Sequence, residues 1–218
     1  MSKVKITFLV FVVVSVLDII GVIFKIPALV YVFKPLILFS LIFLYVFSLP
    51  IRLKWYTMAL ELCFFGDVLL MFNGELFFIS GLIFFLLAHV LFIKIVIGRL
   101  KKTSFTRIIT SIIPFLILVS LLIFKIKDNL NEMLFPVVIY GLTIATFGVV
   151  SLIDYQNSKS KKSLLMLVGA IVFMVSDSVL AINKFYAPAH IFEIIIMVTY
   201  ILAQYLIFRS MIQKNALQ

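Results

Sequence analysis

Two carboxylates stand at matching positions in otherwise apolar stretches of the sequence, Asp67 within residues 64–73 and Asp177 within residues 174–183. They are 110 positions apart, and each has a small residue before it, a leucine three positions later and an asparagine six positions later. Two carboxyl groups close together in a low-dielectric site do not both ionise easily, so one stays an acid beside a base. Such a pair suits a hydrolysis in which one atom is protonated while water is activated at another.

The composition indicates where these carboxylates lie. The chain is 65% hydrophobic and 13% charged, whereas soluble domains are nearer half apolar and a quarter charged. We therefore expect an all-α polytopic membrane protein, in which an intramembrane carboxylate is costly and is usually retained for function. The net charge of +10 comes from basic residues in short loops between apolar runs, which favours a topological role over a nucleic-acid partner.

A bundle of about eight transmembrane helices is expected to position the two carboxylates. A crossing needs roughly twenty apolar residues, which predicts spans at 6–24, 34–50, 55–73, 76–97, 107–125, 133–154, 162–183 and 189–210. Pro35 and Pro136 are expected in the first turns of the second and sixth spans. We expect one transmembrane domain over residues 1–218, with the Asp motifs in the third and seventh spans suggesting two parallel four-helix repeats.

The lysines and arginines predict the orientation of these spans. One side of the membrane would carry Lys3, Lys5, Arg52, Lys54, Arg99, Lys101, Lys102, Arg107, Lys159, Lys161, Lys162, Arg209 and Lys214. The other side would carry Lys25, Lys34, Lys125, Lys127 and Lys184. The positive-inside rule then places both termini in the cytoplasm, and we expect an integral protein of a bacterial inner (cytoplasmic) membrane.

This topology predicts a pocket in the outer half of the bilayer. Asp67 and Asp177 each lie six residues, roughly 9 Å, before the predicted outer end of their span, and Asp18 and Tyr140 lie at a similar depth. The expected rim consists of Lys34, Asn73, Asn183, Lys184 and His190. Helical spacing places further candidates on two faces: Phe78, Gly81, Phe85 and His89 on one, and Glu193, Met197, Tyr200 and Gln204 on the other.

Structural alternatives stand beside each of these assignments. Asp67 and Asp177 together could form a hydrogen-bonded pair that only holds the bundle, His89 could bond between helices, and Asp18 could pair with a hydroxyl or a lysine. Glu61, about 120° round the helix from Asp67, is expected to pair elsewhere. We expect no cofactor and no metal: two histidines and one cysteine disfavour a histidine-rich zinc centre, although a carboxylate-held metal is left open.

Several short motifs in this order carry a resemblance to a known family. They are Lys34-Pro35-Leu36, Gly66-Asp67-x-x-Leu70, Gly81 with His89, Pro136 with Tyr140, Gly169-Ala170-x-x-Phe173-x-x-Ser176-Asp177-x-x-Leu180-Ala181-x-x-x-Phe185, and Tyr200 with Ala203-Gln204. In these residues the chain resembles the YhhN / lysoplasmalogenase family of eight-helix membrane proteins over nearly its full length.

The resemblance implies hydrolysis of the vinyl ether bond of a lysoplasmalogen, which gives a fatty aldehyde and a glycerophospho-base. We expect one of Asp67 and Asp177 to protonate the enol ether and the other to stabilise the resulting cation and orient water. Tyr140, His89 and Gln204 are expected to hold the water or the ether oxygen. Lys34 and Lys184 are expected to meet the phosphate of a lysophospholipid.

Two rival functions belong to other classes. Intramembrane acids are also found in proton-coupled transporters, although these usually have helices broken by Gly or Pro at mid-span. The second rival is a lipid-binding or scaffolding membrane protein without turnover. The sequence leaves open which aspartate is the acid, the head group of the substrate and the oligomeric state.

Overall fold

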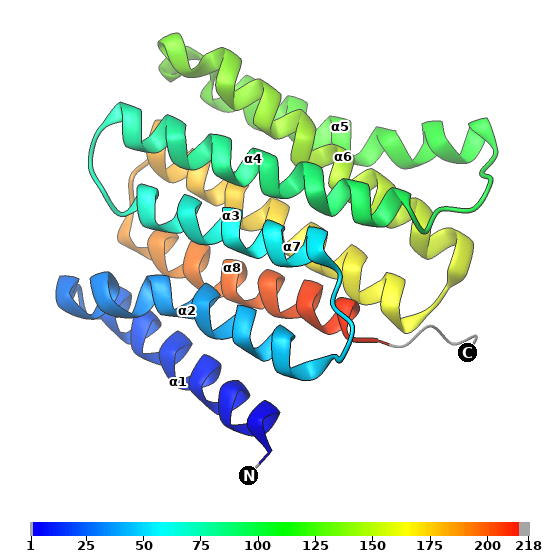
Figure 1. Ribbon diagram of the computed structural model, residues 1–218. Helices are drawn as coiled ribbons and strands as arrows, with labels where there is room; N and C mark the ends of the chain where they lie inside the picture. The colour runs from blue at the N-terminus through cyan, green and yellow to red at the C-terminus, as the bar shows by residue number, and fades with distance from the viewer. Residues whose placement is uncertain (1, 214–218) are drawn as a thin grey trace. The chain divides into compact units, whose positions relative to one another are not determined.

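The computed structural model describes residues 2–213, and over these residues the chain is helical without any strand (Figure 1). The helices are α1 (Lys3–Ile23), α2 (Pro27–Ser48), α3 (Lys54–Leu70), α4 (Glu75–Ile97), α5 (Phe105–Ile126), α6 (Leu134–Ser158), α7 (Lys161–Phe185) and α8 (His190–Met211). Two short 3-10 helices, η1 (Lys127–Asn129) and η2 (Asn131–Met133), join α5 to α6. The predicted all-α fold is confirmed, while Lys214, one of the residues that predict the topology, lies outside the described residues.

The lengths and apolarity of these helices suit a bilayer. Seven of the helices in the described part of the chain, all except α3, are long and apolar enough to cross a membrane. Helix α3 has 17 residues, which is the lower limit for a crossing. The protein is therefore an integral membrane protein built as a polytopic helical bundle.

Most helices lie within a few residues of their predicted ranges, but α2 does not. It begins at Pro27 rather than at residue 34, and Pro27 takes the first-turn position that proline favours. Pro35 is inside the helix, so its predicted first-turn position is wrong. Lys34 consequently lies seven residues, roughly 10 Å, inside α2 rather than at its start, because the helix continues through a lysine that the hydropathy rule treated as a boundary.

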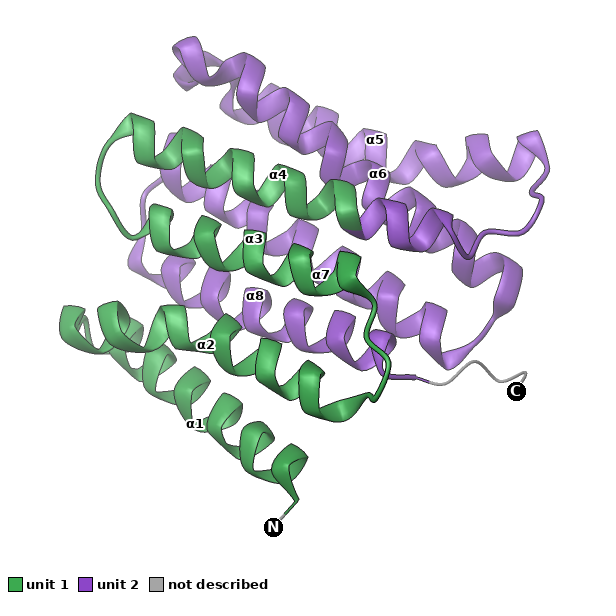
Figure 2. Ribbon diagram, in the orientation of Figure 1, with its two compact units in different colours: residues 1–91 green, residues 92–218 purple. Residues whose placement is uncertain are grey.

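The chain divides into two compact units, residues 1–91 and residues 92–218 (Figure 2). In the first unit, α1 packs against α2 and α2 packs against α3. The rings of Tyr45 and Tyr56 meet edge to face with centroids 4.7 Å apart, and the Leu53 amide donates to the Tyr45 hydroxyl at 2.9 Å. These contacts determine how α3 follows α2. One transmembrane domain with two parallel repeats stays a prediction.

In the second unit, α7 packs against α6 on one side and against α8 on the other. Its start is stabilised by a capping box between Ser160 and Ser163. Helix α8 lies close to α7 at Gly169, where an added Cβ would lie 2.9 Å from Cγ1 of Ile207. Only glycine fits there, so α7, the helix that carries Asp177, is held between its neighbours.

Candidate functional site

Asp67 continues the buried face of α3. That face comprises Tyr56, Ala59, Leu60, Cys63, Gly66 and Asp67, spaced three or four residues apart as one side of a helix requires. The Asp67 side chain is only 3% exposed. Glu61 on the same helix is exposed, which agrees with its predicted separation from Asp67. The sequence spacing therefore distinguishes correctly the two acids of α3.

Helix α4 closes over the residue before Asp67. A Cβ on Gly66 would lie 2.7 Å from two ring carbons of Phe85, so glycine allows this ring to pack directly against α3. The predicted face of α4, made of Phe78, Gly81, Phe85 and His89, is buried at all four positions. The Nδ1–H of His89 donates to the Phe85 carbonyl at 2.8 Å, which leaves Nε2 as the acceptor of the neutral ring.

Asp18 on α1 and Lys34 on α2 lie near each other within the first unit. The Asp18 side chain is fully buried on α1, and among residues 2–213 neither of its carboxylate oxygens has a hydrogen-bond partner. Lys34 on α2 lies within electrostatic range of this carboxylate. Lys34 is only half-buried, and the role of Asp18, in the site or as a structural partner of a lysine, stays a prediction.

Asp177 lies on α7 and is bound by a residue of the preceding helix. The hydroxyl of Tyr140 on α6 donates a short hydrogen bond to the Asp177 carboxylate. Both residues line a cavity of about 30 Å³, together with Met174 and Ser178 of α7. A space of that size holds one or two water molecules where polar groups can bind them. The cavity therefore has room for a water beside a carboxylate and a phenol, the groups that orient water in a hydrolysis.

Other predicted site residues on α7 connect this helix to α8. The Ser176 hydroxyl donates to the Ile196 carbonyl of α8 at 3.0 Å. The Asn183 side-chain oxygen accepts from the Ala189 amide at 2.8 Å, which closes the turn before α8. Lys184 is exposed at the end of α7. The polar groups of Ser176 and Asn183 thus stabilise the α7–α8 pair.

Tyr200 and Gln204 lie one helical turn apart on the buried face of α8. The Gln204 amide donates to the Tyr200 hydroxyl at 3.3 Å, and the Tyr200 ring meets Phe173 of α7 edge to face with centroids 5.5 Å apart. Gln204 is fully buried, and its carbonyl oxygen has no hydrogen-bond partner within the described chain. It therefore keeps an acceptor for a further ligand.

The predicted common depth of the two carboxylates is not seen relative to the helix ends. Asp67 lies three residues, about 4.5 Å, before the end of α3 at Leu70. Asp177 lies eight residues, about 12 Å, before the end of α7 at Phe185. Both distances were predicted as six residues because each asparagine was taken as a helix end, but α3 stops earlier and α7 continues further.

The matched family covers both of these helices. The model of the YhhN family matches residues 29–211, well over half of the chain. The chain belongs to the YhhN family. No curated protein and no solved structure matches it. The family match begins after α1, so Asp18 lies outside it while Asp67, Tyr140 and Asp177 lie within it.

Helix α5 of this YhhN-family chain also contributes to the cavity beside Asp177, although no site residue was predicted on it. Val119, Leu122 and Ile123 line that cavity. Apolar side chains in an apolar helix carry no chemical signal in a sequence, so only packing identifies them. Within residues 2–213, no group of three His, Cys, Asp or Glu side chains is close enough to hold a metal ion.

Proposed function

We propose that this YhhN-family protein is a membrane-embedded hydrolase that cleaves the vinyl ether bond of a lysoplasmalogen, or of a related lysolipid. The products are a fatty aldehyde and a glycerophospho-base. The observation that carries the proposal is the Tyr140–Asp177 hydrogen bond beside a cavity with room for water. The buried Asp67 and membership of the YhhN family support it further.

The proposed mechanism gives the two aspartates different tasks. Asp67 donates a proton to the β-carbon of the vinyl ether, which leaves an oxocarbenium-like cation at the α-carbon. Asp177, already the acceptor of the Tyr140 hydroxyl, acts as the carboxylate that stabilises this cation and orients the attacking water. Water adds to the α-carbon, and the hemiacetal then collapses with cleavage of the bond from the α-carbon to oxygen. Asp177 takes the proton that the adding water loses, and the hemiacetal hydroxyl proton passes to the departing glycerol oxygen. The proton balance closes when the proton on Asp177 returns to Asp67 through solvent.

The remaining predicted residues have supporting roles in this proposal. His89 and Gln204 hold the water, since each is buried and carries an acceptor atom to which a water hydrogen can bond. Lys34 and Lys184 are proposed to attract the phosphate of the approaching lysophospholipid by longer-range electrostatics, without binding it. No cofactor, metal or nucleic acid takes part, and the partners are the lysophospholipid and the surrounding bilayer.

Purified protein in detergent, incubated with a 1-alkenyl lysophospholipid in D₂O, tests this reaction. One deuterium should enter carbon 2 of the released aldehyde, because the first step protonates that carbon. Asp67→Asn and Asp177→Asn should each lower aldehyde release by about a hundredfold or more. Glu61→Gln and Asp128→Asn, exposed acids of the two units, are the matched controls. Full activity in either aspartate variant would remove that residue from the mechanism.

A proton-coupled transporter is the alternative that the same preparation tests. Helices α3 and α7 are continuous and have no proline, whereas transporters usually have broken helices at the binding site. A carrier would release no aldehyde in detergent and would show uptake in sealed vesicles. That pair of results would replace the hydrolase proposal.

We propose further that the protein lies in a bacterial inner membrane with both termini in the cytoplasm, as the distribution of lysine and arginine suggests. Reporter fusions at the two ends test this orientation. A C-terminal fusion that is active only outside the cytoplasm would contradict it.

A further inference from the structure

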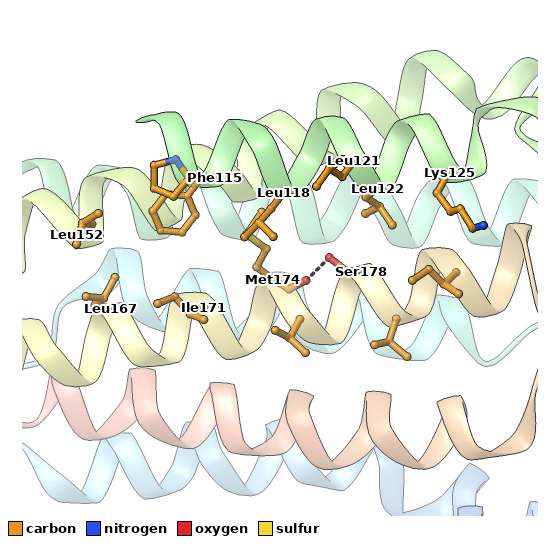
Figure 3. Close-up of a pocket in the computed structure, with 14 residues that line it drawn as sticks. Phe115, Leu118, Leu121, Leu122, Lys125, Leu152, Leu167, Ile171, Met174 and Ser178 are labelled. Carbon is orange, nitrogen blue, oxygen red and sulfur yellow. Dashed lines mark hydrogen bonds between the residues drawn. The ribbon is translucent and has the colours of Figure 1, made fainter. Parts of the chain in front are cut away.

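A long apolar groove runs along the second unit between α5 and α7 (Figure 3). Its volume is about 640 Å³, within the range of sites that enclose one small-molecule ligand. Among the residues that line it, only Lys125 and Ser178 have polar side chains. The Ser178 hydroxyl donates to the Met174 carbonyl at 2.7 Å within its own helix. Lys125 is therefore the polar side chain that the groove offers to a ligand.

Lys125 lies at one end of the groove, one residue before α5 ends. Its ammonium group lies 4.4 Å from the ring centroid of Tyr186, just after α7. From Phe115 to Lys125 the apolar wall of α5 is ten residues, roughly 15 Å, long. A wall of this form, apolar along its length and cationic at one end, is complementary to a hydrocarbon chain that ends in a phosphate.

The groove adjoins the cavity beside Asp177. Leu122, Met174 and Ser178 line both spaces. Leu122 lies three residues, roughly 4.5 Å, from Lys125 along α5. In a lysophospholipid the ether bond is separated from the phosphate by the glycerol carbons, a similar distance. A phosphate on Lys125 would therefore bring that bond to the level of Leu122, one of the three residues that line both the groove and the cavity beside Asp177.

We propose that this groove holds the single hydrocarbon chain of a lysophospholipid substrate, with the phosphate bound by Lys125. The choice of substrate class rests on the proposed function, whereas the groove and its cation are independent of it. Large apolar side chains of the groove, such as Leu118 and Leu121, are 56% and 62% exposed. A ligand chain would replace ordinary bilayer lipid against them at no hydrophobic gain, so preference for a lysophospholipid depends on the contact of its phosphate with Lys125.

Binding of an uncleavable probe tests the proposal separately from the reaction. The probe is a radiolabelled lysophospholipid whose chain is joined by a saturated ether, and binding is measured on purified protein in detergent. Leu118→Trp, which fills the groove, should weaken binding about tenfold or more. Leu116→Trp is the matched control, since Leu116 lies on the same helix, is 47% exposed and does not line the groove. Leu121→Trp repeats the test if Leu118→Trp does not fold.

A second comparison tests the phosphate contact. Lys125→Gln should weaken binding of the phosphate-bearing probe roughly fivefold. The same variant should bind a monoalkyl glycerol, which has no phosphate, as well as the wild type does. Lys127→Gln is the matched control and should bind both probes like the wild type. Equal weakening of both probes by Lys125→Gln would overturn the phosphate contact.

Three outcomes distinguish a failure of the binding proposal from a failure of the proposed reaction. If the probe binds equally well to Leu118→Trp, Leu121→Trp and Leu116→Trp, the groove is not the binding site and the proposal is overturned. A two-chain phospholipid that competes as well as the lysophospholipid would identify the occupant as ordinary bilayer lipid and overturn the proposal. If the groove variants lose probe binding but the wild type releases no aldehyde, the groove is supported and the proposed reaction is wrong.

Discussion

The hydrogen bond from Tyr140 to Asp177 makes a quantitative prediction about catalysis. Tyr140→Phe removes the hydroxyl that donates to the carboxylate but keeps the buried ring. A hydrogen bond to a charged group contributes about 1.5–3 kcal/mol. If the whole of that contribution is lost from the transition state in which Asp177 stabilises the cation, kcat should fall about 10- to 150-fold. KM should change little, because Tyr140 is proposed to act through Asp177 and not on the substrate.

Aldehyde release over a range of lysoplasmalogen concentrations measures both constants. Tyr31→Phe is the matched control, since Tyr31 is an exposed tyrosine of α2. The measurement is made well below the unfolding temperature of each variant, because loss of the bond also lowers the free energy of unfolding. A variant with kcat within about twofold of the wild type, less than 0.5 kcal/mol, would refute this role for Tyr140.

A double-mutant cycle separates positioning from a general effect on the fold. In an Asp177→Asn background, Tyr140→Phe should have almost no further effect on kcat, because residues that act as a unit are not additive. Two full and independent losses would mean that Tyr140 affects the reaction by another route.

Three further substitutions test the packing that supports the site. Gly66→Leu forces a side chain into the Phe85 ring and should destabilise the protein by about 1–3 kcal/mol. Unfolding on heating is followed by dye labelling of the buried cysteine Cys63. Adding Phe85→Ala to the Gly66→Leu variant should restore part of the lost stability. Gly169→Leu, where α8 is in contact, should lower the unfolding temperature by a similar free energy, and an unchanged temperature would contradict the close approach. Asn183→Ala removes the acceptor for the Ala189 amide and should cost about 1 kcal/mol, seen as faster proteolysis of the α7–α8 turn.

The sequence predicted well those features that depend on periodicity and hydropathy. Residues three and four apart share a helix face whatever the helix packs against, so the buried face of α4 and the separation of Asp67 from Glu61 follow from spacing alone. Helix ends were predicted less well. The end of α3 at Leu70 and the start of α2 at Pro27 depend on backbone hydrogen bonding at turns, to which hydropathy is insensitive.

By itself, the sequence determined that this is an all-α membrane protein, which aspartates lie within apolar helices and which family the chain resembles. Tertiary structure alone decided that the Tyr140 hydroxyl of α6 donates to the Asp177 carboxylate of α7 within the second unit. It also decided that apolar residues of α5 line both the cavity beside Asp177 and the groove leading from Lys125. The physical reason is that a leucine facing a cavity and a leucine facing lipid satisfy the same hydrophobic requirement, so only the packing of neighbouring helices distinguishes them.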